Sequence, residues 1–490
     1  MPGMSPLAVL PGIGIGFMRL GAGLYDILTA LKNDQKRFPK IDISYSSRTP
    51  LSLPVIVELS QNGLRLRFDG PEQRLRLIEI IDLEQDQFTV KNESLISTSD
   101  VSNRPGRSPL LYRRVYQLFG ASYPGEFIPS VPPSPTGTYV VSYPGIALSF
   151  TLESSAWSPE VDHAKMLADR MSTVSSIAVF EGKSWAEARK HLFTGKSNFP
   201  QSLSNNPRQR EGLPDEIDNI SIQQDNKIEF FRRTNLPVTV TIGKTTAQDL
   251  INDFGPPDST FKRPGDTSEG TIRPSRGSRR RSSSVVPRSF GSTPSSLSST
   301  NTDTYDADFE EDDGIDGPDI VRPEDQYYCY FHHGFDVLVG SATEHATGTL
   351  SSTASQPVAT RIIFHGNVPG SFEFNRHRRC RWTLARTNDN STELTSESSF
   401  PTIHEQLVAQ FKNEWPERDM REGMVIVRDW AGDSPSNSAI LIGESADEEE
   451  EESWGHEGGD KWLKNTQLYK FPGLMFEVMH NGAITALTVY

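Results

Sequence analysis

The residues best suited to metal chemistry are one cysteine and two adjacent histidines: Cys329, His332 and His333. Thiolates and imidazoles are the usual ligands of zinc, but zinc sites in small modules draw on two such pairs. No second Cys or His pair stands at that spacing, and neighbouring residues of a strand point to opposite faces. We therefore interpret both histidines as strand-end residues beside Gly334 and predict no metal ion and no cofactor.

Signatures of enzymatic catalysis are missing from the sequence. It holds no Gly-x-Ser-x-Gly elbow for a nucleophile and no Gly-x-x-x-x-Gly-Lys-Ser/Thr loop for a phosphate. The glycine-rich stretch Gly12–Gly16 has no strand before it, and none of His163, His191, His365 and His404 can be tied to a particular Ser or Asp. We predict that the protein is not an enzyme, and keep a membrane-associated enzyme acting on lipid or phosphate as the less favoured alternative.

One short run is strongly basic. It contains Arg376, Arg378, Arg379 and Arg381, followed by Trp382. Attraction to an anionic membrane contributes about 1 kcal/mol per basic residue, so four arginines alone would bind only weakly. The run is either a solvated hairpin or a contact with phosphoinositide headgroups or an acidic partner, and we take its four arginines as the candidate contact residues.

A second basic run precedes three serines, Ser282, Ser283 and Ser284. Arginines just before serines in a polar segment suit basophilic kinases, and a phosphate there would invert the local charge. The three serines are the candidate phosphorylation sites, and a nuclear-localisation signal is the alternative interpretation of the arginines.

The charge of the chain is concentrated in two segments. The net charge is −15, of which residues 264–325 carry −6 and residues 432–460 carry −10, so the rest is close to neutral. A broad basic footprint is absent, and we predict no nucleic-acid partner. Two cysteines in 490 residues give no disulfide framework, which fits a reducing compartment. No run of 18 apolar residues occurs, so we expect a cytoplasmic protein without a membrane-spanning helix.

The elements that position these residues follow a recurring pattern. Alternating apolar residues, typical of a strand with one buried face, begin directly after Gly63, Gly145, Gly334 and Gly473. A helical pattern precedes each strand. The four predicted helices are centred on Leu24–Leu31, Val115–Phe119, Leu250–Phe254 with Thr246 as its cap, and Leu407–Phe411. Further strands are predicted at 75–80, 177–180, 228–231, 361–364 and 484–489.

The sequence thus predicts an α+β fold of about four helix-plus-antiparallel-meander units with two long disordered insertions. The first unit spans 1–100, and the second spans 108–240, where 157–236 forms an irregular extension. The third unit spans 241–385 and is interrupted by the disordered segment 264–325. The fourth spans 400–490 and is interrupted by the acidic loop 432–467.

Several blocks of residues match a known family in order along the chain. The first set is Tyr45-Ser46, Pro50-Leu51-Ser52, Gln61-Asn62-Gly63, Phe68-Asp69, Gln73-Arg74-Leu75 and Ile78-Glu79. The second is Phe119-Gly120-Ala121, Pro124-Gly125 and Leu148-Ser149-Phe150. The last blocks are Pro369-Gly370, Phe372, Phe374-Asn375, Arg379-Cys380, Phe476 to Met479 and Thr488-Val489-Tyr490. With these blocks the chain resembles the phagosome (phagophore) assembly factor family, a eukaryotic family long uncharacterised.

The resemblance implies a non-enzymatic scaffold or adaptor in autophagy. Such a protein would associate with a β-propeller protein of the breast-carcinoma-amplified-sequence-3 type at the autophagosome formation site, where the propeller is associated with phosphoinositides. It would be cytoplasmic and recruited to the phagophore. The family's older association with vesicle sorting leaves a general trafficking adaptor at Golgi or endosome as the alternative. The two insertions and the more basic run Arg376–Arg381 depart from the family pattern, and no functional residue is carried over.

Overall fold

The structure is a computed structural model. It describes residues 5–85, 87–96, 109–122, 125–130, 135–158, 165–167, 172–194, 216–223, 225–233, 236–262, 325–340, 356–385, 393–426, 440–444 and 466–490. One compact unit comprises Met1–Phe261 and Gln326–Tyr490, and Lys262–Asp325 form a second unit. The predicted insertion 264–325 and the candidate sites Ser282, Ser283 and Ser284 lie outside the described residues.

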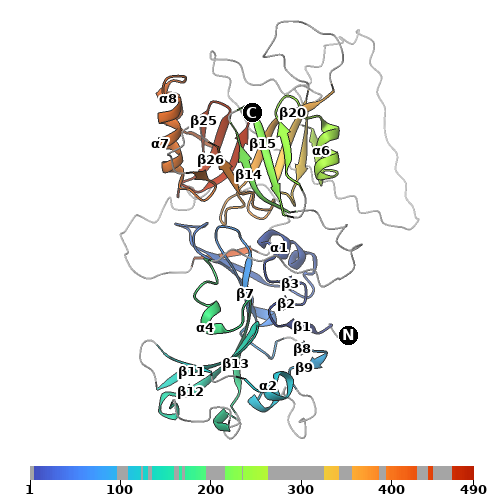
Figure 1. Ribbon diagram of the computed structural model, residues 1–490, viewed down its shortest axis with the longest axis vertical. Coiled ribbons are helices and arrows are strands. Elements are labelled where there is room, and N and C mark those ends of the chain that lie inside the picture. The colour runs from blue at the N-terminus through green and yellow to red at the C-terminus, as the bar shows by residue number, and fades with distance from the viewer. Residues whose placement is uncertain are drawn as a thin grey trace, which may run out of the picture. The chain divides into compact units, whose positions relative to one another are not determined.

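The compact unit has two halves. The first half comprises the strands and helices between Leu7 and Phe180 together with the strand Ile440–Glu444, and it contains two sheets (Figure 1). The five-stranded sheet has the order β3 (Met18–Arg19), β2 (Gly14–Ile15), β1 (Leu7–Leu10), β8 (Phe88–Val90), β9 (Glu93–Ser94). The nine-stranded sheet has the order β10 (Glu126–Pro129), β11 (Thr136–Tyr143), β12 (Ile146–Glu153), β13 (Val174–Phe180), β7 (Leu75–Ile80), β6 (Leu64–Phe68), β5 (Val55–Leu59), β4 (Ile41–Tyr45), β24 (Ile440–Glu444).

The second half also contains two sheets. The five-stranded sheet has the order β16 (Val238–Thr241), β15 (Lys227–Arg232), β14 (Ile217–Ile222), β21 (Trp382–Leu384), β22 (Leu394–Thr395). The eight-stranded sheet has the order β17 (Ser259–Lys262), β18 (Gln326–Tyr330), β19 (Phe335–Gly340), β20 (Val358–His365), β27 (Ile484–Val489), β26 (Leu474–Met479), β25 (Thr466–Phe471), β23 (Met424–Ile426).

The strand order of the second half reproduces that of the first. In each half, two meanders join by antiparallel pairing of their last strands, β7 with β13 and β20 with β27. In each half, a parallel pair joins the smaller sheet, β1 with β8 and β14 with β21. The helices occupy matching places in this order, α1 (Leu24–Asn33) with α6 (Ala247–Phe254) and α2 (Tyr112–Phe119) with α7 (Phe400–Phe411). The shorter helices are α4 (Trp185–Ala188) and α8 (Glu417–Arg421).

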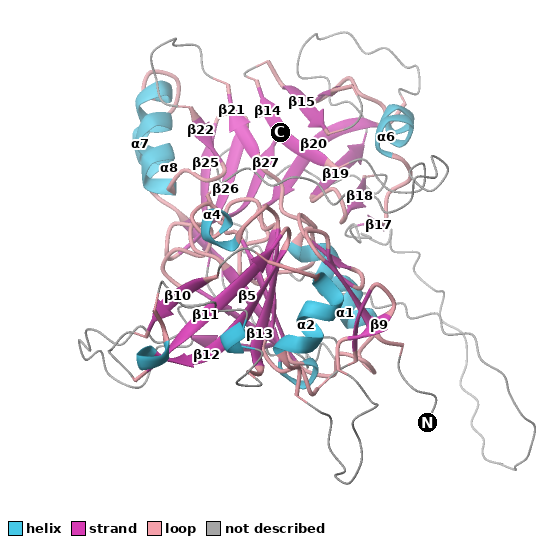
Figure 2. Cartoon of the chain, turned by 60° about the horizontal axis from the view of Figure 1, so that its bottom comes forward, coloured by secondary structure: helices cyan, strands magenta, loops and turns pink. Residues whose placement is uncertain are grey.

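Each half buries its apolar residues between its two sheets and its helices, as the alternating patterns predict. In the first half, Leu24, Ile27, Leu28 and Leu31 of α1 join one core with residues of both sheets. In the second half, Leu250 and Phe254 of α6 and Ile403 and Leu407 of α7 join the other. Figure 2 shows α1 and α2 beside the strands of the first half, and α6 and α7 beside those of the second. All four predicted helices are confirmed, and mixed α+β architecture is therefore confirmed.

The four glycines of the recurring pattern lie in the turn between the second and third strands of each meander, namely the β5–β6, β11–β12, β18–β19 and β25–β26 turns. Gly63, Gly145, Gly334 and Gly473 have φ values of 66°, 78°, 88° and 71°, in the left-handed region that costs other residues roughly 1–2 kcal/mol. Their surroundings differ. A Cβ at Gly145 would collide with the backbone of Gly12. Among the described residues other than its chain neighbours, the only heavy atom within 4 Å of a Cβ at Gly473 is Tyr490 O, at 3.6 Å.

Two matched substitutions test this difference. Gly473→Ala is expected to cost only the conformational strain, about 1–2 kcal/mol of unfolding free energy. Gly145→Ala carries the same strain and also forces the Pro11–Gly12 turn away, so we expect a further loss of about 1–3 kcal/mol. Urea denaturation of both variants measures the difference, and equal losses would show that the Gly12 contact is not made.

The acidic loop predicted over 432–467 is not wholly structureless. Ile440–Glu444 forms β24, which pairs in parallel with β4 at the edge of the nine-stranded sheet, and Thr466 already belongs to β25. An isolated apolar segment, Ile440–Ile442, has no neighbouring pattern to reveal a strand, because its partner lies about 400 residues earlier. Among the described residues, no helix is long and apolar enough to cross a membrane.

Candidate functional site

The basic run Arg376–Arg381 lies in the segment between β20 and β21, where acidic side chains from distant parts of the chain surround it. Arg378 Nη2 donates to both carboxylate oxygens of Asp26 at 2.6 Å, and its Nη1 lies 3.3 Å from Glu216 Oε1. Burial acts to lower the pKa of Arg378, but Asp26 and Glu216 outweigh it and raise that pKa. The same salt bridges hold the pKa of Glu216 below its usual value, although burial opposes this.

Arg379 is the most enclosed arginine of the run, with 3% of its side chain exposed. Its Nε donates to Pro71 O at 2.6 Å and its Nη1 to Gly366 O at 2.7 Å. Glu397 lies 3.7 Å from its Nη2. Arg379 therefore ties the segment after β20 to the turn between β6 and β7, 308 residues earlier.

The two remaining arginines are more accessible. Arg381 has 31% of its side chain exposed and pairs with Glu397 at 2.8 Å and with Glu72 at 3.4 Å. Arg376 has 38% exposed and pairs with Glu373 at 3.4 Å. The run is thus not a solvated hairpin, and the carboxylates closest to its arginines belong to the chain itself. Contact with lipid or with a separate acidic partner stays a prediction, and accessibility confines it chiefly to Arg376 and Arg381.

A pair of buried amides strengthens the same junction. Asn367 Nδ2 donates to Gln73 Oε1 at 2.8 Å, and Gln73 Nε2 donates to Asn367 O at 2.7 Å. Asn367 Oδ1 also accepts from Asn375 N at 2.7 Å. We call the contacts of Asn367, Arg378 and Arg379 with the first half the arginine junction. Two of the sequence blocks that carry the family resemblance, around Gln73 and around Arg379, meet in it.

A cluster of ionisable residues lies beside the arginine junction. Asp336 of β19 receives two imidazoles: His365 Nε2 lies 3.0 Å from its Oδ2, and His377 Nε2 lies 3.1 Å from its Oδ1. The two rings stack with centroids 3.6 Å apart and planes within 10° of each other. Because an ionised carboxylate only accepts hydrogen bonds, both Nε2 atoms carry a proton. We call Asp336, His365 and His377 the buried triad.

The pKa values of the buried triad diverge. Burial acts to raise the pKa of Asp336, but the charge of His365 and hydrogen bonds from both rings hold it well below its usual range. Burial lowers the pKa of His377 to about 4, and the neighbouring His365 adds to this effect. Burial opposes protonation of His365 as well, but Asp336 raises its pKa above the ordinary value. One proton is therefore held preferentially on His365, which neutralises the buried carboxylate.

The buried triad is a poor metal site in this arrangement, although its ligand atoms lie within 4.8 Å of one another. An imidazole binds a metal ion in the plane of its ring, and an ion in the plane of one of two stacked rings lies outside the plane of the other. Metal-bound histidines also donate their second ring nitrogen to an acceptor, whereas Nδ1 of both His365 and His377 is buried without a hydrogen-bond partner. The geometry suits instead a proton that is shared between the Asp336 carboxylate and the two imidazoles.

The other residues considered for chemistry are held in place locally. His332 and His333 lie in the turn between β18 and β19, not at a strand end, and His332 Nδ1 is 2.5 Å from Asp258 Oδ2. Burial lowers the pKa of His333 to about 4, with His332 adding to this. Cys380 is a free thiol whose pKa burial raises to about 12, so it is not an activated nucleophile.

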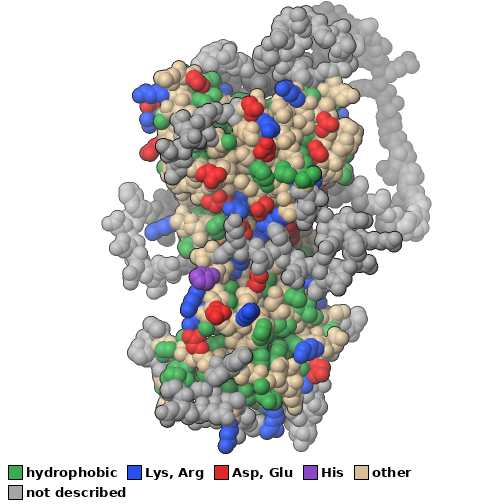
Figure 3. Space-filling view, viewed as in Figure 1, with side chains coloured by type: hydrophobic (Ala, Val, Ile, Leu, Met, Phe, Trp, Pro, Cys, Tyr) green, Lys and Arg blue, Asp and Glu red, His purple; other side chains and the backbone are tan. Residues whose placement is uncertain are grey.

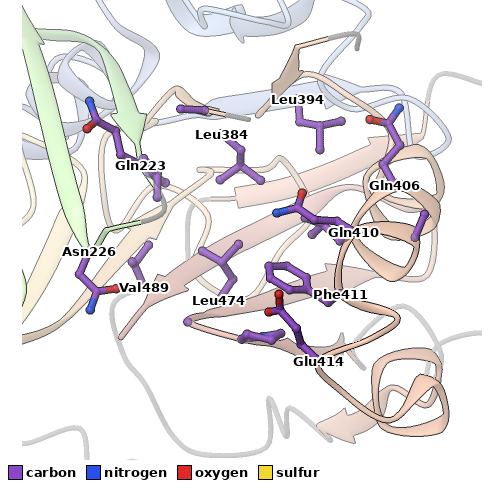
Figure 4. A pocket seen from close by; sticks show the side chains of 16 residues that line it. Gln223, Asn226, Leu384, Leu394, Gln406, Gln410, Phe411, Glu414, Leu474 and Val489 are labelled. Carbon is purple, nitrogen blue, oxygen red and sulfur yellow. The ribbon is translucent and has the colours of Figure 1, made fainter. Parts of the chain in front are cut away.

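A pocket of about 790 Å³ opens in the second half between the β14–β15 turn, α7 and the Pro472–Gly473 turn. Its walls are polar and apolar in about equal measure: Leu384, Phe411 and Leu474 contribute apolar side chains, and amide side chains such as Gln410 lie between them (Figure 4). The face in Figure 3 shows basic and acidic side chains intermixed.

Sequence reasoning missed the buried triad and the carboxylates of the arginine junction. The sequence assigns no hydrogen-bond partner to His365, since Asp336 and His377 lie 29 and 12 residues away from it. No local spacing rule joins residues of a strand, a strand end and a loop. The signal that did exist was the density of arginines at 376–381, because buried arginines require carboxylates nearby.

Fold and site together define an α+β protein of two matching sheet assemblies that are joined by a buried polar junction. The chain belongs to the phagosome assembly factor 1 family, whose model matches residues 14–273 and 318–490. The resemblance inferred from the sequence blocks is thereby confirmed. Membership implies a role in phagosome assembly, and the family is defined by that assembly role and not by an enzymatic reaction.

Relatives occur in animals and plants. A PHAF1 protein of Drosophila melanogaster is 20% identical over 494 residues, which cover 99% of this chain and 94% of the relative. One of Caenorhabditis elegans is 20% identical over 411 residues, covering 80% of each chain. One of Arabidopsis thaliana is 27% identical over 150 residues, covering 31% of this chain and 33% of the relative. No solved structure matches significantly.

Proposed function

We propose that this protein is a non-enzymatic scaffold and adaptor in autophagy. The observation that carries the proposal is the arginine junction. It links residues 21–76 to 216 and 366–381 through ion pairs and amide hydrogen bonds, so that strands from both halves belong to one compact unit. A body with a fixed arrangement of surfaces can hold two partners at a defined separation, which is what an adaptor requires.

We further propose that the four predicted units are true repeats, arranged as two pairs. The support is the matched order of strands and helices in the two halves, together with the left-handed glycine in the turn between the second and third strands of each meander. The ranges 1–100, 108–240, 241–385 and 400–490 are the units we propose, although β14, β15 and β16, which pair in a sheet of the second half, lie almost entirely within the second range. Repeats of this kind present similar surfaces twice, which favours binding over catalysis.

The partner we propose is a β-propeller protein of the breast-carcinoma-amplified-sequence-3 type, met at the phagophore. We expect it to bind the folded sheets and not the acidic segment Glu448–Glu452. A specific interface of at least about 1,000 Å² in total should survive moderate salt. The measurement is co-purification of the propeller with the full chain and with a variant lacking 270–320 and 446–460, which keeps β24. Equal capture by both forms is the expected result.

Two outcomes would contradict these proposals. Capture by the full chain alone would place the interface in the deleted segments. Capture by neither form, with no starvation-induced recruitment to punctate sites, would remove the autophagy role and favour a general vesicle-trafficking adaptor. The weak phosphoinositide contact is also a proposal. It is tested with anionic liposomes and the double variant Arg376→Gln, Arg381→Gln, which leaves the more deeply buried Arg378 and Arg379 in place.

A further inference from the structure

The pocket of the second half occupies a place that the chain itself fills in the first half. In the first half, the β1–β2 turn lies on the Pro144–Gly145 turn, and Gly12 N donates a hydrogen bond to Gly145 O at 2.9 Å. The corresponding elements of the second half are the β14–β15 turn and the Pro472–Gly473 turn. Here described residues of both turns, Gln223 and Asn226 of one and Pro472 and Gly473 of the other, line the pocket of about 790 Å³. No described atom of the β14–β15 turn lies within 4 Å of a Cβ built on Gly473.

Gly473 O of the second half corresponds to Gly145 O of the first half, but it accepts one backbone hydrogen bond from the described residues instead of two. Phe180 N and Gly12 N both donate to Gly145 O, at 3.2 and 2.9 Å. Gly473 O accepts from Tyr490 N at 3.1 Å, which is the counterpart of the Phe180 bond. A carbonyl oxygen has two lone pairs, so Gly473 O can accept a second N–H in the position that Gly12 N takes in the first half.

The remaining polar groups of the pocket also suit a peptide. Gln223, Asn226 and Gln410 bring amides that can both donate to and accept from a peptide backbone. Among the described residues that line the pocket, Glu414 is the single ionisable one. It repels an anionic headgroup and attracts a basic side chain. An acyl chain would leave the amides desolvated without partners, which is costly.

We propose that this pocket binds a peptide segment of a partner protein that offers apolar side chains and at least one Lys or Arg. Its apolar side chains contact Leu384, Phe411 and Leu474, which Figure 4 shows around one space. One backbone N–H donates to Gly473 O, and the basic side chain pairs with Glu414. A volume of this size lies within the range of about 300–1,000 Å³ typical of ligand sites.

The test uses the full chain and a phage-displayed library of random dodecapeptides. Selected peptides are labelled with fluorescein, and their dissociation constants are measured by fluorescence polarisation. Ala409→Trp fills the pocket from an exposed position of α7, and Lys412→Trp places the same side chain at an exposed position of the chain that does not line it. We expect apolar, basic peptides whose affinity falls about tenfold or more in Ala409→Trp and changes less than about twofold in Lys412→Trp. Glu414→Lys should weaken the basic peptides by a few-fold.

Several results would overturn the proposal. These are selection of no peptide, equal binding to Ala409→Trp and the wild type, or a consensus of acidic peptides. A fluorescent fatty acid that binds the wild type but not Ala409→Trp, where no peptide does, would assign the pocket to an acyl chain. The proposal adds a site to the adaptor role. Peptide binding by purified protein and co-purification of the propeller from cells are separate readouts, so either can fail alone.

Discussion

Replacing Arg379 with Met is expected to lower the free energy of unfolding by about 3–5 kcal/mol, which is the usual cost of removing one partner from a buried charged network. The methionine fills a similar volume but donates nothing. Pro71 O and Gly366 O lose their hydrogen bonds, and Glu397 loses one of its two arginine partners. Chemical denaturation monitored by circular dichroism measures the change.

Arg376→Met is the matched control, because it makes the same substitution three residues earlier. Arg376 has 38% of its side chain exposed and pairs with Glu373 within the same turn of chain. An exposed pair of this kind contributes roughly 0.2–1 kcal/mol, so the two variants should differ by several-fold in their cost. A similar small loss for both would mean that the arginine junction does not hold the halves together.

Acidification from pH 6.5 to pH 4 is expected to destabilise the protein through His377. The pKa of this histidine is about 4 in the folded state and about 6.5 when it is exposed, so the unfolded state takes up the proton first. Its contribution therefore decreases as pH falls through that window, by at most about 1.4 kcal/mol per pH unit. Asp336, whose pKa is depressed, loses its contribution only below its unfolded pKa near 4.

His365 acts in the opposite direction. Its folded pKa is raised, so its contribution is complete below about pH 6.5 and is lost as pH rises through the folded pKa. Stability should thus reach its maximum close to neutral pH. Urea denaturation between pH 4.5 and 8.5 measures the profile. His377→Gln should flatten the acid side, while His480→Gln, at an exposed turn position, should leave it unchanged. An unchanged acid side in His377→Gln would exclude the buried triad as its cause.

Sequence periodicity was sufficient to predict the four helices and the strands that follow the four glycines. It missed other strands, and the expectation that no strand precedes Gly12–Gly16 is wrong, because β1 ends at Leu10. Leu250 and Phe254 are buried on one face of α6, and Thr246 caps that helix through a reciprocal hydrogen-bond pair with Asp249. The left-handed turn at Gly334 and the burial of Phe335, Val337 and Val339 likewise follow from local rules, whereas the burial of Leu338 between them does not. Such features depend only on residues within one or two turns, and so the sequence order alone determines them.

The pairing of the meanders could not be predicted in the same way. Ile177 lies opposite Ile80, and Phe364 lies opposite Leu487, at separations of about one hundred residues and more. Many apolar strands could pair with the last strand of either meander. An alternating pattern determines which face of a strand is buried, but not which strand lies next to it. The same limitation hid the partners of Arg378, since Asp26 resembles any other acidic residue on a helix until the two segments are placed together.

The arginine junction also determines the order in which parts of the chain can reach their final structure during synthesis. Domains generally fold as the chain is synthesised, beginning at the N-terminus. Strands β4 to β13 are complete once residue 180 has been made, but Asp26, Glu72 and Gln73 wait for partners some 300 residues later. Counted from residue 180, at roughly 5–20 residues per second, the delay lasts from about 10 to 40 seconds. During it, the first half exposes the Asp26 carboxylate without Arg378 and an unpaired β4 edge, so the nascent chain presents to chaperones a surface that the finished protein conceals.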